Sequence, residues 1–268
     1  MTELQGIVHD LPDDVYFGHD SLSSTGARRL LDSPARFRYE QDNPQAPRQA
    51  FDEGHAIHTL VLGTGSNIVE LEFDNYRTKA AQEERDAVYA AGGVPMLVKD
   101  MAPIRATAEA VLAHPTARRL FEQDGTPETS LFAEIDGVAC RARFDYYAPV
   151  AVDLKTTAGR ADRHGFAQAA AKYGYEVQDA WYRDVREAVT GERGEFVFVV
   201  VEKDAPNLIG VHQLDRDFVD LGRAKTRRAR AVYADCIESN QWPGYPEPIQ
   251  LVVPPVWLVN DAIDKELA

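Results

Sequence analysis

The chain has 268 residues, of which 44% are hydrophobic and 27% are charged, and its formal net charge is −14 at pH 7. A chain of this length buries roughly 70–75% of its unfolded surface, so it can form a core without disulfides. The acidic balance argues against a protein that coats nucleic acid without specificity. No apolar run reaches the roughly 20 residues of a membrane span and no signal peptide opens the sequence, so we expect a cytoplasmic protein with no membrane partner.

The first quarter of the chain is predicted to be an extended arm followed by helices. Residues 1–20 show little periodicity, whereas residues 21–40 have helical spacing that Ser33-Pro34 breaks into two helices. Four arginines gather there, and they suit either solvated helix faces or contacts with phosphates. They are Arg28, Arg29, Arg36 and Arg38.

A loop over residues 43–48 precedes a predicted helix over residues 50–62, which carries His55 and His58. Two histidines three positions apart lie on one helical face and could suggest zinc. No third or fourth zinc ligand can be located, so the pair alone does not predict a zinc site. The following segments are less informative: a short strand at 69–73, a charged helix at 79–91 and an amphipathic helix at 101–123 with a break at His114-Pro115.

The most informative segment is predicted to form three strands. Residues 131–135 and 138–146 alternate apolar and polar side chains around Asp136-Gly137, a two-residue hairpin signal. The third strand, residues 150–156, is apolar except where Asp153 and Lys155 share one face. These two residues and Asp145 form a group of charges that is unfavourable to bury, and a divalent metal between the carboxylates removes that penalty.

The rest of the chain is predicted to alternate helices and strands. Gln178 and Tyr182 are four apart on one helical face, where they suit either a polar patch or a role beside the charged strand. The last long helix has the densest basic segment, which suits a solvated face, a subunit contact or DNA binding. The predicted elements are helices at 164–173, 175–190 and 217–240, strands at 196–202 and 208–214, and a proline-rich tail at 243–255 laid over the core.

Cysteine usage and one missing motif exclude several classes of protein. Cys140 is predicted in a strand and Cys236 in a helix, so the two thiols make no disulfide framework. Two cysteines are also too few for an iron–sulfur cluster held by four of them. The sequence lacks the G-x-x-x-x-G-K-[ST] loop of ATP-hydrolysing proteins, so we expect no use of ATP.

Several short motifs together resemble one family. Asp145, followed after seven residues by Asp153-Leu154-Lys155, resembles the D…(D/E)-x-K signature of the PD-(D/E)XK nuclease superfamily. Residues 178–182 resemble the Q-x-x-x-Y motif of its RecB-like branch, and residues 54–58 its G-x-A-x-H helix. Leu22 to Pro34 and Trp242 to Tyr245 resemble phage exonucleases of the RecE type, which are similar to exonuclease VIII.

The resemblance implies an α/β fold with a restriction-endonuclease-like core, in which helices flank a central mixed sheet. It also implies a single nuclease domain over residues 1–268. The arm and first helices would occupy residues 1–49, the nuclease core residues 50–214, and the last helix and proline-rich tail residues 215–268.

The residues and the resemblance together predict a site for one or two Mg²⁺ or Mn²⁺ ions. Asp145 and Asp153 would bind through carboxylate oxygens and Leu154 through its carbonyl oxygen, because Mg²⁺ prefers hard oxygen ligands. Lys155 would orient or help deprotonate the attacking water and offset charge on the phosphate. The resemblance adds His58 and Glu128 to the metal shell, Gln178 and Tyr182 to the catalytic residues, and Arg28, Arg36, Arg141, Arg143 and Gln178 as substrate contacts.

Some of these assignments have a structural alternative. Glu128 could be an ordinary exposed carboxylate or an extra acid of the site. Arg141 and Arg143 alternate on the strand that carries Asp145, and could pair with acidic neighbours or contact the substrate backbone. The sequence leaves these alternatives open.

The resemblance implies an exonuclease that degrades the 5′ strand from double-stranded DNA ends and leaves 3′ overhangs for phage-type recombination. It further implies a ring-shaped homo-oligomer, a trimer or tetramer, a single-strand annealing partner and a phage or prophage origin. Two other functions stay open: a structure-specific or restriction-like endonuclease, and a DNA-end-binding recombination module with a vestigial nuclease site. Cleavage of covalently closed circular DNA would distinguish an endonuclease from an exonuclease. Metal-dependent hydrolysis of DNA would distinguish either nuclease from the binding module.

Overall fold

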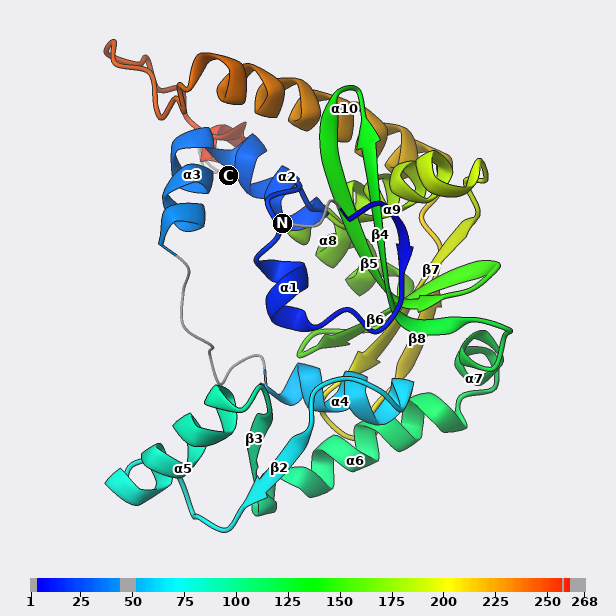
Figure 1. Ribbon diagram of the computed structural model, residues 1–268. Coiled ribbons are helices and arrows are strands. Elements are labelled where there is room, and N and C mark those ends of the chain that lie inside the picture. The colour runs from blue at the N-terminus through cyan, green and yellow to red at the C-terminus, as the bar shows by residue number, and fades with distance from the viewer. Residues whose placement is uncertain (1–3, 44–51, 257, 261–268) are drawn as a thin grey trace.

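The structure is a computed structural model that describes residues 4–43, 52–256 and 258–260. Its centre is a six-stranded sheet in the order β1-β4-β5-β6-β7-β8, with helices on both faces (Figure 1). β6 and β7 run parallel and every other neighbouring pair is antiparallel, so the sheet is mixed, as expected. The strands are β1 (Gly6–Val8), β4 (Thr126–Ile135), β5 (Val138–Tyr147), β6 (Val150–Thr157), β7 (Glu195–Glu202) and β8 (Ile209–His212).

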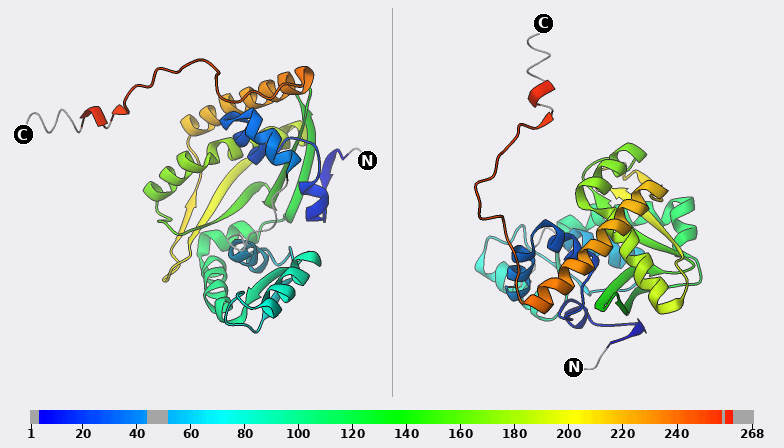
Figure 2. Two further views of the ribbon diagram at one scale, coloured as in Figure 1. Left: turned by 90° about the vertical axis from the view of Figure 1, so that its left-hand side faces the viewer. Right: turned by 90° about the horizontal axis from the view of Figure 1, so that it is seen from above.

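The helices bury the sheet from two sides (Figure 2). On one side lie α2 (Ser24–Asp32), α9 (Tyr175–Thr190) and α10 (Arg216–Ser239); on the other lie α4 (Asp52–Leu62) and α6 (Val98–Ala113), followed by α7 (Pro115–Phe121). Among the described residues, no helix has both the length and the low charge that a bilayer crossing requires. The remaining helices are α1 (Asp13–Phe17), α3 (Pro34–Asp42), α5 (Lys79–Ala90) and α8 (Arg163–Tyr173).

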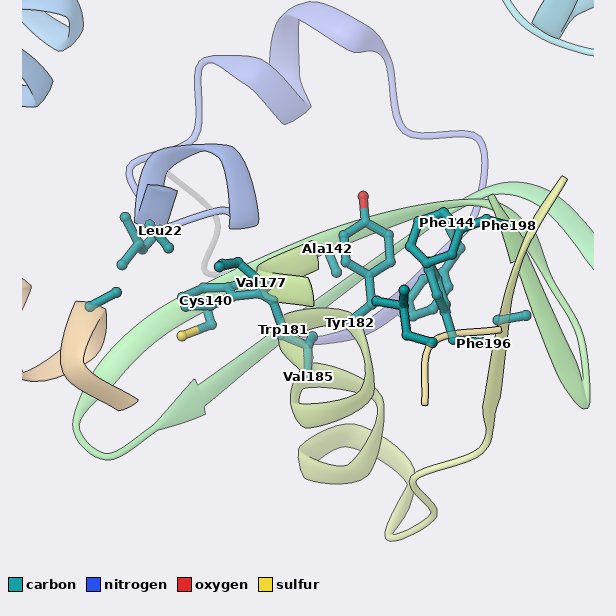
Figure 3. Close-up of a cluster of buried hydrophobic side chains, with 14 of the residues drawn as sticks. Leu22, Cys140, Ala142, Phe144, Val177, Trp181, Tyr182, Val185, Phe196 and Phe198 are labelled. Atoms are coloured by element: carbon teal, nitrogen blue, oxygen red, sulfur yellow. The ribbon is translucent and has the colours of Figure 1, made fainter. Parts of the chain in front are cut away.

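The larger hydrophobic core lies between α9 and the sheet (Figure 3). Trp181 of α9 is 1% exposed, and its indole N–H donates to the carbonyl oxygen of Arg141 in β5 at 2.9 Å. The ring of Phe144 meets that of Tyr182 edge to face, with centroids 4.7 Å apart. A helix that buries an aromatic stripe against two strands has a fixed position, so the polar residues on the same helix are fixed as well.

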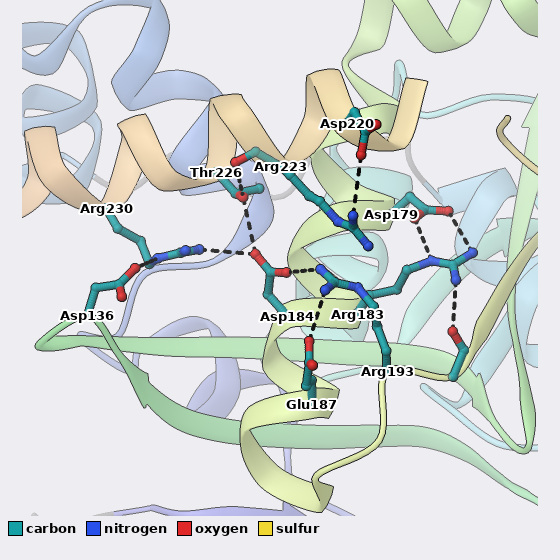
Figure 4. A network of polar contacts seen from close by, with 11 residues as sticks. Asp136, Asp179, Arg183, Asp184, Glu187, Arg193, Asp220, Arg223, Thr226 and Arg230 are labelled. Atoms are coloured by element: carbon teal, nitrogen blue, oxygen red, sulfur yellow. Dashed lines mark hydrogen bonds and ion pairs between the residues drawn. The ribbon is translucent and has the colours of Figure 1, made fainter. Parts of the chain in front are cut away.

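The outer side of α9 is held by ion pairs (Figure 4). Arg230 of α10 donates to Asp136 in the β4–β5 turn at 2.9 Å and to Asp184 of α9 at 3.3 Å. Asp179 is fully buried and pairs with Arg183 one turn later at 2.7 Å. Removing one member of such a pair leaves an uncompensated buried charge. The Arg230 contacts join α9 to α10 and to the β4–β5 turn.

Two sequence-based expectations for the fold were wrong, those for the N-terminal arm and the tail, and one strand was not predicted. The arm over residues 1–20 is not merely extended, because it contains β1 at the edge of the sheet and α1. The strand expected at 69–73 is β2 (Ile68–Leu71), which pairs in parallel with an unexpected strand, β3 (Val94–Leu97), outside the central sheet. The tail does not lie over the core: Ile249 and Leu251 are 102% and 94% exposed, and the chain runs away from the body (Figure 2).

The other elements match their predicted positions within a few residues. β4 begins at Thr126, five residues earlier than predicted, and the helix expected at 101–123 is α6 and α7, which meet at the predicted break. Cys140 and Cys236 are both free and buried. The loop predicted at 43–48 lies outside the described residues except for Asn43.

Trp181→Ala is expected to lower the free energy of unfolding by about 3–5 kcal/mol, because it leaves a cavity and an unpaired carbonyl oxygen in the larger core. Urea denaturation followed by circular dichroism measures this change. Tyr39→Ala is the matched control, since the Tyr39 side chain is 67% exposed and its loss should change stability by less than about 0.5 kcal/mol. Equal effects of the two substitutions would contradict this assignment of the core.

Candidate active site

The site begins where β5 and β6 separate. The two strands share a single ladder pair, Tyr146 with Val152, and the backbone pairing stops there. Beyond that pair, the backbone N–H of Leu154 donates to Asp145 Oδ2 at 2.7 Å. A buried N–H needs an acceptor, so the carboxylate takes the place of the missing strand carbonyl. Asp145 is thereby fixed beside the residues of β6.

Asp153 and Lys155 lie on the face of β6 that α9 covers, while Leu154 packs on the opposite face, as the strand period predicts. Lys155 Nζ lies 2.5 Å from Asp153 Oδ2. Gln178 of α9 donates its side-chain N–H to Asp153 Oδ1, also at 2.5 Å. Both oxygens of a carboxylate that is 2% exposed therefore have a neighbour that offsets its negative charge.

His58 reaches the site from the opposite face. Ala56 of α4 is fully buried, which lets the helix approach the sheet closely. His58 follows Ala56 by two positions on this helix, and its Nδ1 lies 3.5 Å from Asp145 Oδ2. His55, on the same helix, has no hydrogen bond or ion pair with any of the predicted site residues.

Glu128 faces Asp145 across the β4–β5 ladder. Its neighbours Pro127 and Thr129 pair with Tyr146 and Phe144, which leaves Glu128 opposite Asp145. Its backbone has φ of 48°, a left-handed conformation that is unfavourable for a residue with a Cβ and is held by the surrounding ladder. The strand register therefore places Glu128 opposite Asp145, and the Glu128 side chain is partly buried rather than fully exposed.

Burial and neighbouring negative charge together raise the pKa values of two carboxyl groups, those of Glu128 and Asp145. Burial, followed by the charge of Asp145, raises the pKa of Glu128 to about 8. Burial, followed by the charge of Asp153, raises the pKa of Asp145 to about 6. Burial lowers the pKa of Lys155, but the charges of Asp153 and Asp145 outweigh it and raise that pKa above its usual value. Lys155 is therefore protonated at neutral pH.

The donor set fits a hard divalent cation. In the described part of the chain, no three His, Cys, Asp or Glu side chains gather closely enough to hold a metal ion in their present positions. The reason is visible in the contacts, because Asp153 is turned toward Lys155 and Gln178, and Asp145 toward a backbone N–H. Buried carboxylate oxygens that lie close together are nevertheless the ligands that Mg²⁺ or Mn²⁺ would stabilise.

Arg28 is the predicted substrate contact that lies nearest the site. Its side chain is half-buried near Asp153 and Tyr182, and it donates to the carbonyl oxygen of Tyr173 and to Thr25 Oγ1. Arg36 lies apart from the site residues, on α3. It is exposed and pairs with Asp32 and the Tyr245 hydroxyl.

Arg141 and Arg143 have the structural role that the sequence left open as an alternative. Arg141 is 7% exposed and donates to the carbonyl oxygen of His19 at 2.6 Å. Arg143 is 8% exposed and pairs with Asp13 of α1 at 2.5 Å. Both guanidinium groups contact the N-terminal segment that lies beside β5, and their assignment as substrate contacts stays a prediction.

Tyr175 is a contact of Lys155 that the motifs do not include. The Lys155 Nζ lies 5.2 Å from the centroid of the Tyr175 ring. A signal for it existed in the sequence, because Tyr175, Gln178 and Tyr182 form one stripe at helical spacing. Tyr182 itself is 8% exposed within the aromatic core, with its hydroxyl at the edge of the cluster (Figure 3).

Paired carboxylates and a lysine where two strands separate, in a mixed sheet flanked by helices, define the PD-(D/E)XK class of nuclease folds. Residues 23–253 match the family described as "PDDEXK-like domain of unknown function (DUF3799)", and the chain belongs to this family. No curated protein matches the sequence.

Two crystal structures are similar to the chain. One is a "Putative exonuclease" from Eubacterium rectale, with a TM-score of 0.59 and 15% identity, over 91% of this chain and 97% of that one. This similarity supports the fold. The other is a "phage related exonuclease" from Haemophilus somnus 129PT, with a TM-score of 0.35 and 12% identity, over 83% of this chain and 97% of that one. A TM-score at that level does not support a common fold.

The raised pKa values predict a pH-dependent stability. Between its ordinary pKa near 4.5 and the folded value of about 8, Glu128 holds its proton longer in the folded state than in the unfolded state. The free energy of unfolding therefore falls as pH rises through this window. Asp145 adds a further decrease in the free energy of unfolding, which ends near pH 6.

Glu128→Gln is expected to remove the decrease in the free energy of unfolding between pH 6 and pH 8, and to leave only the contribution of Asp145 below pH 6. Urea denaturation at a series of pH values in EDTA measures this difference. The exposed Glu109→Gln is the matched control and should keep the wild-type slope. A wild-type slope in Glu128→Gln would show that Glu128 titrates normally.

Proposed function

We propose that the protein is a Mg²⁺- or Mn²⁺-dependent exodeoxyribonuclease that degrades one strand, in the 5′ to 3′ direction, from double-stranded DNA ends. The observation that carries this proposal is the group formed by Asp145, Asp153 and Lys155 in a PDDEXK-like family member. The Eubacterium rectale structure, 97% of whose chain is covered by the match, supports exonuclease action through its name, "Putative exonuclease".

Asp145, Asp153 and the carbonyl oxygen of Leu154 would hold the metal, with His58 and Glu128 completing the shell. When bound, the ion supplies a Lewis acid and an activated water at neutral pH. These ligands come from three strands and one helix, β4, β5, β6 and α4. Hard oxygen donors with one imidazole suit Mg²⁺ or Mn²⁺ better than a thiol-seeking metal.

Lys155 and Gln178 act on the substrate and on the carboxylates. The Lys155 ammonium is charged and lies beside Asp153, so it can orient the attacking water and offset negative charge that develops on the phosphate. Gln178 holds the Asp153 carboxylate in one orientation through its hydrogen bond. Arg28, half-buried near Asp153, is placed to contact a neighbouring phosphate.

The finer parts of the proposal come from the resemblance to RecE-type phage exonucleases. They are 3′ single-stranded overhangs as product, a ring-shaped homo-oligomer, a single-strand annealing partner in recombination, and an intracellular enzyme of phage or prophage origin. The acidic net charge is compatible with them, because a nuclease needs positive charge only where the DNA lies.

The first test uses linear duplex DNA labelled separately at its 5′ and 3′ ends, with a covalently closed circle as control. We expect loss of the 5′ label from linear DNA with Mg²⁺ and no cleavage with EDTA or with Asp153→Ala. Cleavage of the circle would instead establish an endonuclease. Absence of hydrolysis with any divalent metal, with DNA binding retained, would leave a binding module.

Lys155→Ala is expected to keep metal and DNA binding but to lower kcat at least about 100-fold, because it removes the ammonium beside the scissile phosphate. Calorimetry measures metal binding, and single-turnover cleavage of labelled DNA measures the chemical step. The exposed Lys99→Ala is the matched control for loss of one positive charge. Hydrolysis at the wild-type rate by Lys155→Ala would remove the proposed role of this lysine.

A further inference from the structure

An aromatic ring lies against the lysine of the site. Lys155 Nζ is 5.2 Å from the centroid of the Tyr175 ring, and the lysine side chain is 22% exposed. A lysine side chain has four rotatable carbon–carbon bonds, so one ion pair does not fix where its ammonium points. A ring face attracts the ammonium from a second direction, and the attraction is stronger where water is partly excluded.

The Tyr175 ring is itself held in place by a stack of rings. It stacks on Phe198 of β7 at 5.6 Å and on Phe166 of α8 at 6.1 Å. Phe166 in turn stacks on His212 of β8 at 4.5 Å with an interplanar angle of 9°. Phe198 is the ladder partner of Asp153, so the stack lies on the face of the sheet that carries the site.

The backbone before Tyr175 is equally constrained. Gly174 joins α8 to α9 with φ of +69°, a conformation that favours glycine. A Cβ on Gly174 would lie 2.8 Å from Arg28 Cδ, so the corner also leaves room for the arginine. Arg28 donates to the carbonyl oxygen of Tyr173, which ties this corner to α2. Both the ring and the backbone of Tyr175 are thus fixed from outside α9.

We propose that Tyr175 is a positioning residue, whose ring face holds the Lys155 ammonium in the orientation that the proposed phosphodiester hydrolysis requires. This inference rests on the proposed function. The ring face makes the contact and the hydroxyl is not needed, so phenylalanine serves in its place. Leucine fills much of the space but has no aromatic face. A role in packing alone would predict that both substitutions are tolerated equally.

Kinetics separate these two roles. We expect Tyr175→Leu to lower kcat about tenfold with KM for DNA unchanged, and Tyr175→Phe to stay within about threefold of the wild-type kcat. Tyr147→Leu is the matched control, because Tyr147 has Arg186 at 5.1 Å from its ring centroid and loses a cation–π contact elsewhere. Thermal unfolding shows that each variant is folded. Equal kcat values for wild type and Tyr175→Leu would overturn the proposal.

A second measurement does not depend on cleavage. Reductive methylation with ¹³C-formaldehyde labels the lysines, and Lys155→Arg identifies the Lys155 signal. We expect this signal to be shifted upfield by the ring in the wild type and in Tyr175→Phe, and to move to the ordinary position in Tyr175→Leu. An unshifted wild-type signal would overturn the proposal. Absence of DNA cleavage by the wild type would count against the proposed function, while the shift still decides whether the ring holds the ammonium.

Discussion

The hydrogen bond from the Leu154 N–H to Asp145 Oδ2 is the interaction on which the site depends. Two neighbouring strands that separate inside a core leave backbone groups without partners, and such groups are unfavourable unless a side chain satisfies them. Asp145 does so, and this fixes a carboxylate next to Asp153. The interruption of the ladder and the concentration of negative charge therefore have the same structural cause.

The charges of Asp145, Asp153 and Lys155 are tolerated because each lies beside a polar or charged partner. Lys155 and Gln178 engage Asp153, and His58 approaches Asp145 from α4. Gln178 reaches Asp153 from α9, and this helix packs against the aromatic core on its sheet-facing side. On its other side, Asp184 of α9 pairs with Arg230 of α10. Ion pairs outside the site thus support the helix that carries Gln178.

The sequence identified much of the fold and the centre of the site, for reasons that can be stated. The Asp136-Gly137 turn, the period of two in β5 and the Asp153–Lys155 pair are local patterns, and local patterns determine which face a side chain occupies. The partners of Arg141 and Arg143 depend on a segment more than 100 positions earlier in the chain, which no periodicity indicates. β3 was missed because four buried residues that include Pro95 are too short a pattern to distinguish from the helix that follows.

The order in which the site is built along the chain has a consequence for folding. The β4–β5 hairpin forms from neighbouring residues, whereas the parallel pairing of β6 with β7 requires α8 and α9 to cross between them. His58 and Arg28 come from the N-terminal third. Long-range pairing is slow because it follows the closure of long loops. We therefore expect the hairpin with Asp145 to form early, and Lys155 to reach its place only when α9 closes over the sheet.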